Sequence, residues 1–169
     1  MTNSFEINSN EIDKIKKITQ EEKKFRIKNL EIFNSTGFPN KKDEDWKFTD
    51  FKNIVDVNFE ELNVKEVVSD IYKINLLKDF KHNYIFLVNG NLHSSNFNYE
   101  EKDKIKITSY DKSINYQTSK NPLVCLNHAL ASTGYSLEIK ENYKFKKVLV
   151  IYNFFTKNVA NKILNNKNN

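Results

Sequence analysis

The sequence predicts an α+β fold in which helices come first and strands gather toward the carboxyl terminus. An amphipathic pattern over residues 11–35 is typical of a helix, and residues 121–134 carry both start and stop signals of another. Two compact apolar runs, residues 84–88 and 147–155, are typical of strands. We therefore expect helices and strands to share one small protein.

The first predicted helix, residues 11–35, has one apolar stripe. Asn10 is expected to cap its start, and Gly37 followed by Pro39 to end it. The stripe consists of Ile12, Ile15, Ile18, Phe25, Leu30 and Phe33. Because lysine, glutamate and glutamine fill the remaining positions, this helix is expected at the surface with one face packed.

The next part of the chain gives weaker signals. Residues 59–72 have mixed apolar spacing that favours a helix, and residues 74–80 favour a short helical or irregular piece. The three acids Asp43, Glu44 and Asp45 are expected to open a helix at its positive end. Three consecutive carboxylates are not expected to face one pocket. We predict a mainly helical region over residues 1–80.

A mixed region of helix and strand is predicted over residues 81–169. Asn89-Gly90 after the first strand indicates a hairpin, with residues 91–97 as an edge strand. A half-buried strand is expected around Ile105 and Ile107. A loop is predicted over residues 111–120 and a strand over residues 135–139. A second strand, residues 147–155, is expected to be covered on both sides. The tail, residues 158–169, has no clear pattern, and its apolar residues Val159, Ile163 and Leu164 are expected to lack packing partners.

The helix predicted over residues 121–134 has the clearest local signals. Asn121 can cap it, Pro122 fits the first helical position, and Gly134 fits a left-handed terminus. Cys125 and His128 lie three positions apart on it and would share a face. Cys-x-x-His is only half of a zinc site, so a buried thiol beside a surface imidazole is the favoured interpretation.

Composition excludes several classes of protein. The 13% aromatic content argues against disorder, and the single cysteine, Cys125, excludes an internal disulfide. No run approaches the ~18 apolar residues of a membrane span, and residues 1–10 lack the apolar core of a signal peptide. We expect a cytoplasmic protein without a membrane partner.

The net charge of +5 raises the alternative of a self-contained basic module that binds nucleic acid. Among the 27 basic residues only Arg26 is an arginine, although the guanidinium fork is favoured for phosphate recognition. The lysines are spread from Lys14 to Lys167 among 22 acids. A solvated surface is therefore favoured, and no nucleic-acid partner is predicted.

No catalytic, cofactor-binding or metal-binding residue is predicted. The three glycines lie far apart, which excludes a P-loop and a dinucleotide fingerprint. His82 and His93 flank the hairpin without metal-ligand spacing. An enzyme that uses Cys125 and His128 is the lowest-ranked hypothesis. The aromatic residues Trp46 and Phe48 are candidate docking anchors, although Trp46 is favoured as a cover of the core.

Residues 37–51, GFPNKKDEDWKFTDF, resemble a signature near the start of SufD proteins. The positions in register with it are Lys42, Glu44, Trp46, Lys47 and Thr49, with Phe48 where tyrosine is usual. Weaker similarities follow at YIFLVNG, residues 84–90, and across residues 126–139. The resemblance covers roughly residues 20–155, and SufB proteins look different around the tryptophan, so SufD is preferred.

This resemblance implies a helical amino-terminal domain that leads into a right-handed parallel β-helix, here expected to be truncated at Asn169. It implies a non-catalytic scaffold subunit, or a fragment of one, in the SUF iron–sulfur cluster assembly complex. The expected partners are SufB-like and SufC-like subunits. An iron–sulfur cluster is implied only for the complex, with no cofactor bound by this chain alone and no functional residue to carry over.

A further expectation concerns residues 147–155. A β-helix buries each coil against the next, so an uncapped end leaves strand edges open. We expect this strand to be poorly protected or prone to aggregation in the isolated chain.

Overall fold

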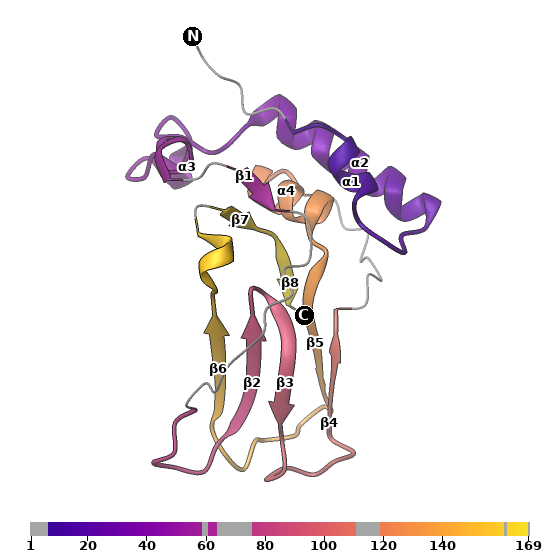
Figure 1. The fold of residues 1–169 in the computed structure, drawn as a ribbon, viewed down its shortest axis with the longest axis vertical. Helices are drawn as coiled ribbons and strands as arrows, with labels where there is room; N and C mark the ends of the chain where they lie inside the picture. Colours follow the sequence, from indigo (N-terminus) through magenta and orange to yellow (C-terminus); the bar gives the residue numbers. More distant parts are fainter. Residues whose placement is uncertain (1–6, 59–60, 64–75, 111–118, 161, 169) are drawn as a thin grey trace. The chain divides into compact units, whose positions relative to one another are not determined.

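The computed structural model describes residues 7–58, 61–63, 76–110, 119–160 and 162–168 (Figure 1). Two compact units interleave along the chain. Unit 1 comprises Met1–Lys65, Lys112–Ser132 and Asn161–Asn165; unit 2 comprises Glu66–Asp111, Thr133–Ala160 and Asn166–Asn169. Each unit has its own hydrophobic cluster. No helix in these ranges is long and apolar enough to cross a membrane.

Unit 1 is mainly helical. Its elements are α1 Asn10–Asp13, α2 Gln20–Thr36, the 3-10 helix η1 Glu44–Trp46, α3 Phe51–Asn58, α4 Pro122–Leu130, and the short strands β1 Glu61–Asn63 and β7 Lys162–Leu164. The two strands pair in parallel. The helical content expected for the first part of the chain is therefore present.

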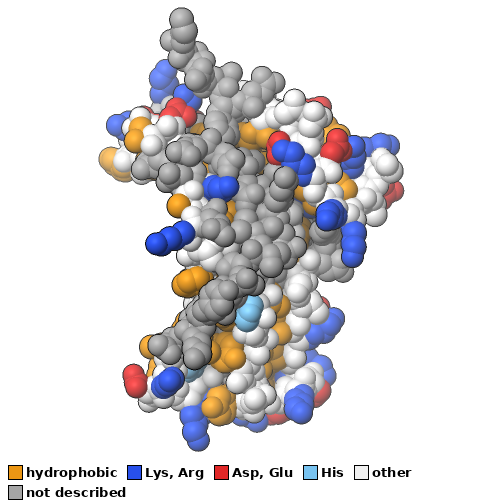
Figure 2. Space-filling view, viewed as in Figure 1, with side chains coloured by type: hydrophobic (Ala, Val, Ile, Leu, Met, Phe, Trp, Pro, Cys, Tyr) orange, Lys and Arg blue, Asp and Glu red, His pale blue; other side chains and the backbone are white. Residues whose placement is uncertain are grey.

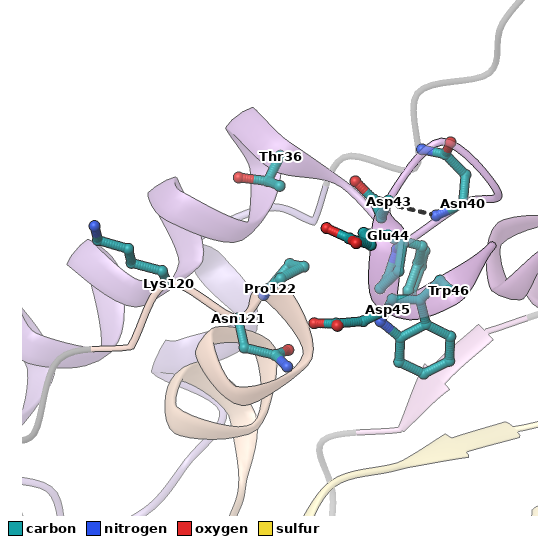
Figure 3. A pocket seen from close by; sticks show the side chains of 11 residues that line it. Thr36, Asn40, Asp43, Glu44, Asp45, Trp46, Lys120, Asn121 and Pro122 are labelled. Atoms are coloured by element: carbon teal, nitrogen blue, oxygen red, sulfur yellow. Dashed lines mark hydrogen bonds between the residues drawn. The ribbon is translucent and has the colours of Figure 1, made fainter.

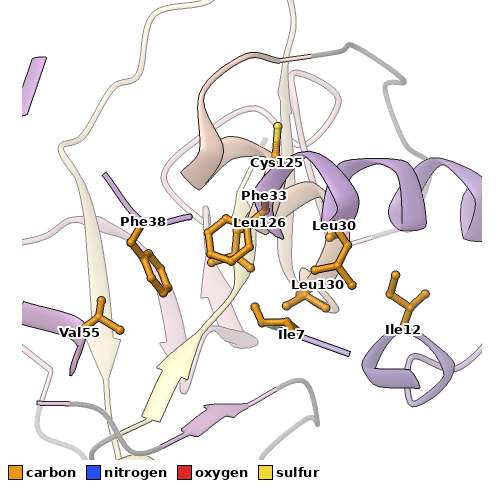
Figure 4. Close-up of a cluster of buried hydrophobic side chains, with 10 residues drawn as sticks. Ile7, Ile12, Leu30, Phe33, Phe38, Val55, Cys125, Leu126 and Leu130 are labelled. Carbon is orange, nitrogen blue, oxygen red and sulfur yellow. The ribbon is translucent and has the colours of Figure 1, made fainter. Parts of the chain in front are cut away.

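The core of unit 1 lies where α2 packs on α4 (Figure 4). Its buried members are Ile7, Ile12, Leu30, Phe33, Phe38, Val55, Cys125, Leu126, Ala129 and Leu130. The apolar stripe of α2 supplies Leu30 and Phe33, as its sequence spacing predicted. Burial of these side chains is the main stabilising contribution to the unit.

The single helix predicted over residues 11–35 is wrong, because the chain forms α1 and α2 with a break between them. Lys17 adopts a left-handed backbone with φ of +60°, which a continuous helix does not allow. Thr19 then caps α2, its Oγ1 accepting a hydrogen bond from the Glu22 backbone N–H at 3.1 Å. Asn10 is the first residue of α1 rather than its cap, and Gly37 ends α2 as predicted.

Two further differences lie between residues 50 and 80. Helix α3 was not predicted, and residues 61–63, expected to be helical, form β1 instead. A strand of this length is defined by its distant partner, β7, and not by any local pattern. The rest of the helix predicted over residues 59–72 lies outside the described residues, as does most of the loop predicted over residues 111–120.

Unit 2 consists of two small sheets. Their strands are β2 Asn83–Val88, β3 Asn91–Asn96, β4 Ile105–Ser109, β5 Thr133–Ile139, β6 Leu149–Phe154 and β8 Asn166–Asn168. One sheet has the order β3-β2-β6 and the other β4-β5-β8. The β2–β3 hairpin turns at Asn89 and Gly90, both with positive φ, as the sequence predicted. Strand β3 lies at a sheet edge, as predicted.

The two sheets of unit 2 contribute side chains to one cluster. Ile85 and Leu87 of β2 and Tyr135 of β5 are buried together, with partly buried neighbours from β3, β4 and β6. The opposite face of β2 is aromatic: the Tyr84 and Phe86 rings both lie within about 6.4 Å of the Tyr152 ring. Strand β2 therefore contributes one face to this cluster and the other face to the aromatic contacts.

Strand β6 was expected to be covered on both sides, and this is wrong. Ile151 is 47% exposed, Phe154 41% and Phe155 58%. Within the described chain β6 pairs with β2 alone, so its other edge carries no strand. The apolar run therefore predicted the strand correctly. It did not predict its burial, because the described residues leave several of its side chains exposed.

The last part of the chain has more structure than its sequence pattern showed. Val159 is buried, and Ile163 packs against the core of unit 1. Helix α4 ends at Leu130, whereas Gly134 lies inside β5 with φ of +138° and its Cα close to the backbone of Lys167 in β8. A glycine is needed here because a side chain would collide with the neighbouring strand, and not because it ends the helix.

Candidate functional site

A pocket of about 460 Å³ lies in unit 1 (Figure 3). Its lining residues are Thr36, Phe38, Pro39, Asn40, Asp43, Glu44, Asp45, Trp46, Lys120, Asn121 and Pro122. One wall comes from the end of α2 and the segment up to η1, and the other from the start of α4. Segments distant in sequence therefore form one concave surface.

The first wall is positioned by a tight turn after α2. Gly37, with φ of +75°, ends the helix while its N–H donates to the Phe33 carbonyl. The Asn40 backbone N–H donates to Asp43 Oδ2 at 2.8 Å, and the Asp43 N–H donates back to the Asn40 carbonyl at 3.0 Å. These bonds fix the position at which η1 begins.

The carboxylates of Asp43, Glu44 and Asp45 all line the pocket, contrary to our expectation. Asp43 precedes η1 with an extended backbone, so its side chain does not follow the rotation of the helix. Asp43 is engaged by the Asn40 N–H. Glu44 and Asp45 are exposed, and their carboxylates have no hydrogen-bond or ion-pair partner in the described chain.

Trp46 connects the pocket to the core through a series of aromatic contacts. Its ring meets Phe51 edge-on with centroids 5.3 Å apart, Phe51 lies 5.8 Å from Phe38, and Phe38 lies 5.0 Å from the buried Phe33. Trp46 is half-buried and is not a member of the core cluster. It is therefore a wall of the pocket that rests on core aromatics.

Phe48, the second candidate anchor, is 89% exposed. The Lys47 ammonium lies over its ring, 5.1 Å from the centroid, which is a cation–π arrangement. Phe48 contributes nothing to the core, and its role as a docking anchor stays a prediction.

The opposite wall is the amino-terminal end of α4. Asn121 Oδ1 accepts hydrogen bonds from the N–H groups of Leu123 and Val124, and Pro122 takes the first helical position, as predicted. In Figure 3 the Asp45 carboxylate points toward this end. A negative charge there is favourable because the helix dipole places partial positive charge at its amino terminus.

Arg26 and Glu22 form a buried ion pair that the sequence reasoning missed. Arg26 is fully buried, and Glu22 Oε1 accepts hydrogen bonds from its Nε at 3.0 Å and Nη2 at 2.9 Å. Arg26 Nη1 donates to the carbonyls of Ala129 and Ala131 at 3.0 and 2.9 Å. The guanidinium thus holds α2 against the carboxyl end of α4.

The same guanidinium supplies donors at the carboxyl end of α4, which lies at Leu130 and not at Gly134. The last carbonyls of a helix need donors, and Arg26 supplies them where a left-handed glycine usually would. Two signals in the sequence point to these residues. Thr19-x-x-Glu22 has the residue pattern of a capping box, although the Glu22 carboxylate bonds Arg26, and Glu22 and Arg26 are an acid–base pair four positions apart.

Glu100 is a second buried charge that the sequence reasoning missed. Its carboxylate accepts hydrogen bonds from the Asn83 amide, the Tyr143 hydroxyl and the backbone N–H groups of Lys146 and Lys147, all between 2.7 and 3.1 Å. Burial alone would raise the pKa of Glu100, but these donors lower it to about 2. The arrangement ties the loop before β6 to β2 and is structural.

The surroundings of Cys125 do not favour a nucleophilic thiol. Cys125 is fully buried, its Sγ lies 3.2 Å from the Ser119 carbonyl, and burial raises the pKa of its thiol. A nucleophilic cysteine requires the opposite shift. His128 stacks at a tilt on Phe25, with centroids 5.6 Å apart. Among the described residues no three His, Cys, Asp or Glu side chains are placed to hold a metal.

The other two histidines belong to the aromatic face of unit 2. His82 is buried, with Nδ1 2.9 Å from the Phe80 carbonyl and Nε2 2.8 Å from the Tyr152 hydroxyl. His93 is exposed and meets the Phe86 ring edge-on at 5.4 Å. Both side chains pack against aromatic rings.

The family model described as SufBD protein N-terminal region matches residues 2–115. That range is more than half of the chain. The chain belongs to the SufB/SufD family of iron–sulfur cluster assembly proteins. A comparison with curated proteins found no match.

The matched range contains only part of the pocket. The wall from Thr36 to Trp46 lies inside the SufB/SufD amino-terminal region, whereas Lys120, Asn121 and Pro122 lie outside it. The part of the signature segment that ends at Trp46 therefore forms a wall that needs the later helix α4 to become concave.

Proposed function

We propose that this chain acts as a SufD-like, non-catalytic scaffold subunit, or part of one, in the SUF complex that assembles iron–sulfur clusters. Membership of the SufB/SufD family is the observation that carries the proposal. The choice of SufD over SufB rests on the residues around Trp46. A cytoplasmic location fits a chain whose single cysteine excludes an internal disulfide.

The pairing of the last strands supports the proposed β-helix. The consecutive strands β6, β7 and β8 each pair in parallel with an earlier strand, namely β2, β1 and β5. Parallel pairing of a later strand with an earlier one is the pairing that stacked turns of a parallel solenoid make, although the partners β2, β1 and β5 do not follow chain order here. The turns after β2 and β6 are also joined by hydrogen bonds. Asn89 Nδ2 donates to Thr156 Oγ1, and the Thr156 backbone N–H donates to Asn89 Oδ1.

In this proposal the chain binds partners and performs no reaction itself. It binds no cofactor alone, and the cluster is the product of the assembled complex. The buried, raised-pKa thiol of Cys125 supports a structural rather than a reactive role for that residue.

Co-purification with SufB-like and SufC-like subunits tests the proposal. The chain would be co-expressed with both subunits from the same genome, and the tagged SufC-like subunit would be captured at physiological salt and then sized. We expect all three chains in one peak at fixed stoichiometry. A basic protein of similar size and net charge serves as the control for non-specific capture. Elution of this chain alone would contradict the proposal.

A further inference from the structure

The geometry points to a binding function for the pocket described above: it receives a cationic side chain, preferably arginine, from a basic segment of another protein. The inference rests on the lining of the pocket and does not depend on which complex the chain joins. Charge, aromatic lining and size each support it.

The charge of the pocket favours a cation. Its lining has three carboxylates against one ammonium, although the whole chain carries a net charge of +5. Glu44 and Asp45 have no partner in the described chain, and Lys120 has none there either, so the acids are not neutralised from within. A guanidinium can satisfy one or two carboxylates through its fork of N–H donors.

The aromatic lining favours the same class of ligand independently. Trp46 is half-buried, and its indole is held edge-on by Phe51, which fixes the ring at the pocket wall. Indole faces attract cations more strongly than other aromatic side chains, and arginine stacks on them. Pro122 is partly exposed, and with the buried Phe38 and Pro39 beneath the lining it gives an apolar surface for the aliphatic stem of a long side chain.

An anionic ligand is the natural competitor, because the pocket includes the amino-terminal end of α4. That end is already faced by the Asp45 carboxylate, as Figure 3 shows, and Asn121 takes two of its N–H groups. A second anion would meet three carboxylates at short range. The volume of about 460 Å³ lies in the range of small-ligand pockets and holds one arginine side chain with part of its backbone.

The test uses Trp46, the only tryptophan of the chain, as a reporter inside the pocket. N-acetyl-arginine amide is titrated at constant ionic strength while Trp46 fluorescence is recorded, with N-acetyl-citrulline amide as the uncharged isostere. We expect a saturable change with the arginine probe, a weaker one with N-acetyl-lysine amide and none with citrulline. Equal responses to arginine and citrulline would overturn the inference.

Variants locate the site. The double variant Glu44→Gln, Asp45→Asn is expected to lower the affinity for the arginine probe by about tenfold or more, because both unpaired carboxylates are removed. The matched control Glu31→Gln removes an exposed acid of α2 outside the pocket and should leave the affinity unchanged. An equal loss in both variants, or a loss in neither, would overturn the inference.

A second readout guards against misfolded variants. Amide chemical shifts of the unsubstituted chain are followed with the same arginine probe. We expect the shifts to concentrate at residues 36–46 and 120–122. Shifts spread over acidic residues throughout the chain would show general charge attraction instead and would overturn the inference.

Discussion

Arg26 holds α2 against α4, and its burial also bears on whether the chain could bind nucleic acid. It is the only arginine of the chain, and it is fully buried and bonded to Glu22 and to α4. A buried guanidinium must have partners for its donors, and this one has both a carboxylate and helix carbonyls. The residue is structural, so the chain has no exposed arginine for phosphate recognition.

Replacing Arg26 by methionine should strongly destabilise the chain. The substitution Arg26→Met would leave the Glu22 carboxylate buried without a counter-charge and the α4 carbonyls without donors, which costs about 3–5 kcal/mol. The free energy of unfolding in urea would measure this. The control Lys23→Met removes a partly exposed cation of the same helix, whose pairing with Asp13 is worth about 1 kcal/mol or less. Equal losses in the two variants would show that Arg26 is not a structural lock.

Glu100 should make stability depend on pH. Burial raises its pKa, but donors from Lys146, Tyr143, Asn83 and Lys147 more than offset this and hold the pKa near 2, below the ordinary 4.5. A depressed folded-state pKa stabilises the fold fully above about pH 4.5, and this contribution is lost as pH falls toward 2.

The variant Glu100→Gln isolates this contribution. Its amide cannot accept every hydrogen bond that the carboxylate accepts, so we expect a loss of about 1–3 kcal/mol at pH 7. The difference in unfolding free energy between the two proteins should shrink between pH 4.5 and pH 2. A difference that stays constant over this window would refute the low pKa.

At the scale of elements, the sequence predicted what local signals determine. The cap at Asn121, the proline after it, and the Asn89-Gly90 turn each act within a few residues, and each was confirmed. The break between α1 and α2 was not predicted. Thr19 is a typical helix cap, but the apolar stripe over residues 11–35 was given more weight. Strands β7 and β8 have three residues each and exist through pairing with β1 and β5, so no local pattern predicts them.

Strand β6 should exchange its amide hydrogens faster than β2. Strand β2 lies between β3 and β6, so its N–H groups are bonded on both sides, whereas β6 has one bonded edge in the described chain. About half of the β6 amides therefore face away from any partner strand. Native-state hydrogen exchange would show rapid exchange at alternate residues of Leu149–Phe154. Protection equal to that of β2 along the whole strand would mean that something else covers its open edge.

At the scale of the whole molecule, the family could be predicted from one segment and the pocket could not. Residues 37–51 carried the resemblance because their residue types and spacing are distinctive. The pocket depends on bringing that segment to the start of α4, more than 70 residues later, and on a backbone turn that aligns three neighbouring acids. Neither the distant contact nor the turn is visible in residue order.

The distribution of charge gives the last prediction, which concerns nucleic acid. Figure 2 shows lysines scattered over the visible face with acidic and polar side chains between them. Several lysines are also engaged with carboxylates, among them Lys106 with Glu138 and Lys146 with Glu101. A dispersed set of paired ammonium groups neutralises few phosphates at once, so few counterions are released on binding.

We therefore expect only weak, non-specific binding to a duplex of about 20 base pairs, with a dissociation constant of about 10⁻⁴ M or weaker at roughly 150 mM salt. Fluorescence anisotropy of a labelled duplex between about 50 and 200 mM salt would measure it. Because few phosphates are contacted, the slope of log affinity against log salt should correspond to two or three contacts at most, that is about −2 to −3. A slope near about −6 with micromolar affinity at physiological salt would instead require a continuous basic surface, and would favour a nucleic-acid-binding module over a scaffold subunit.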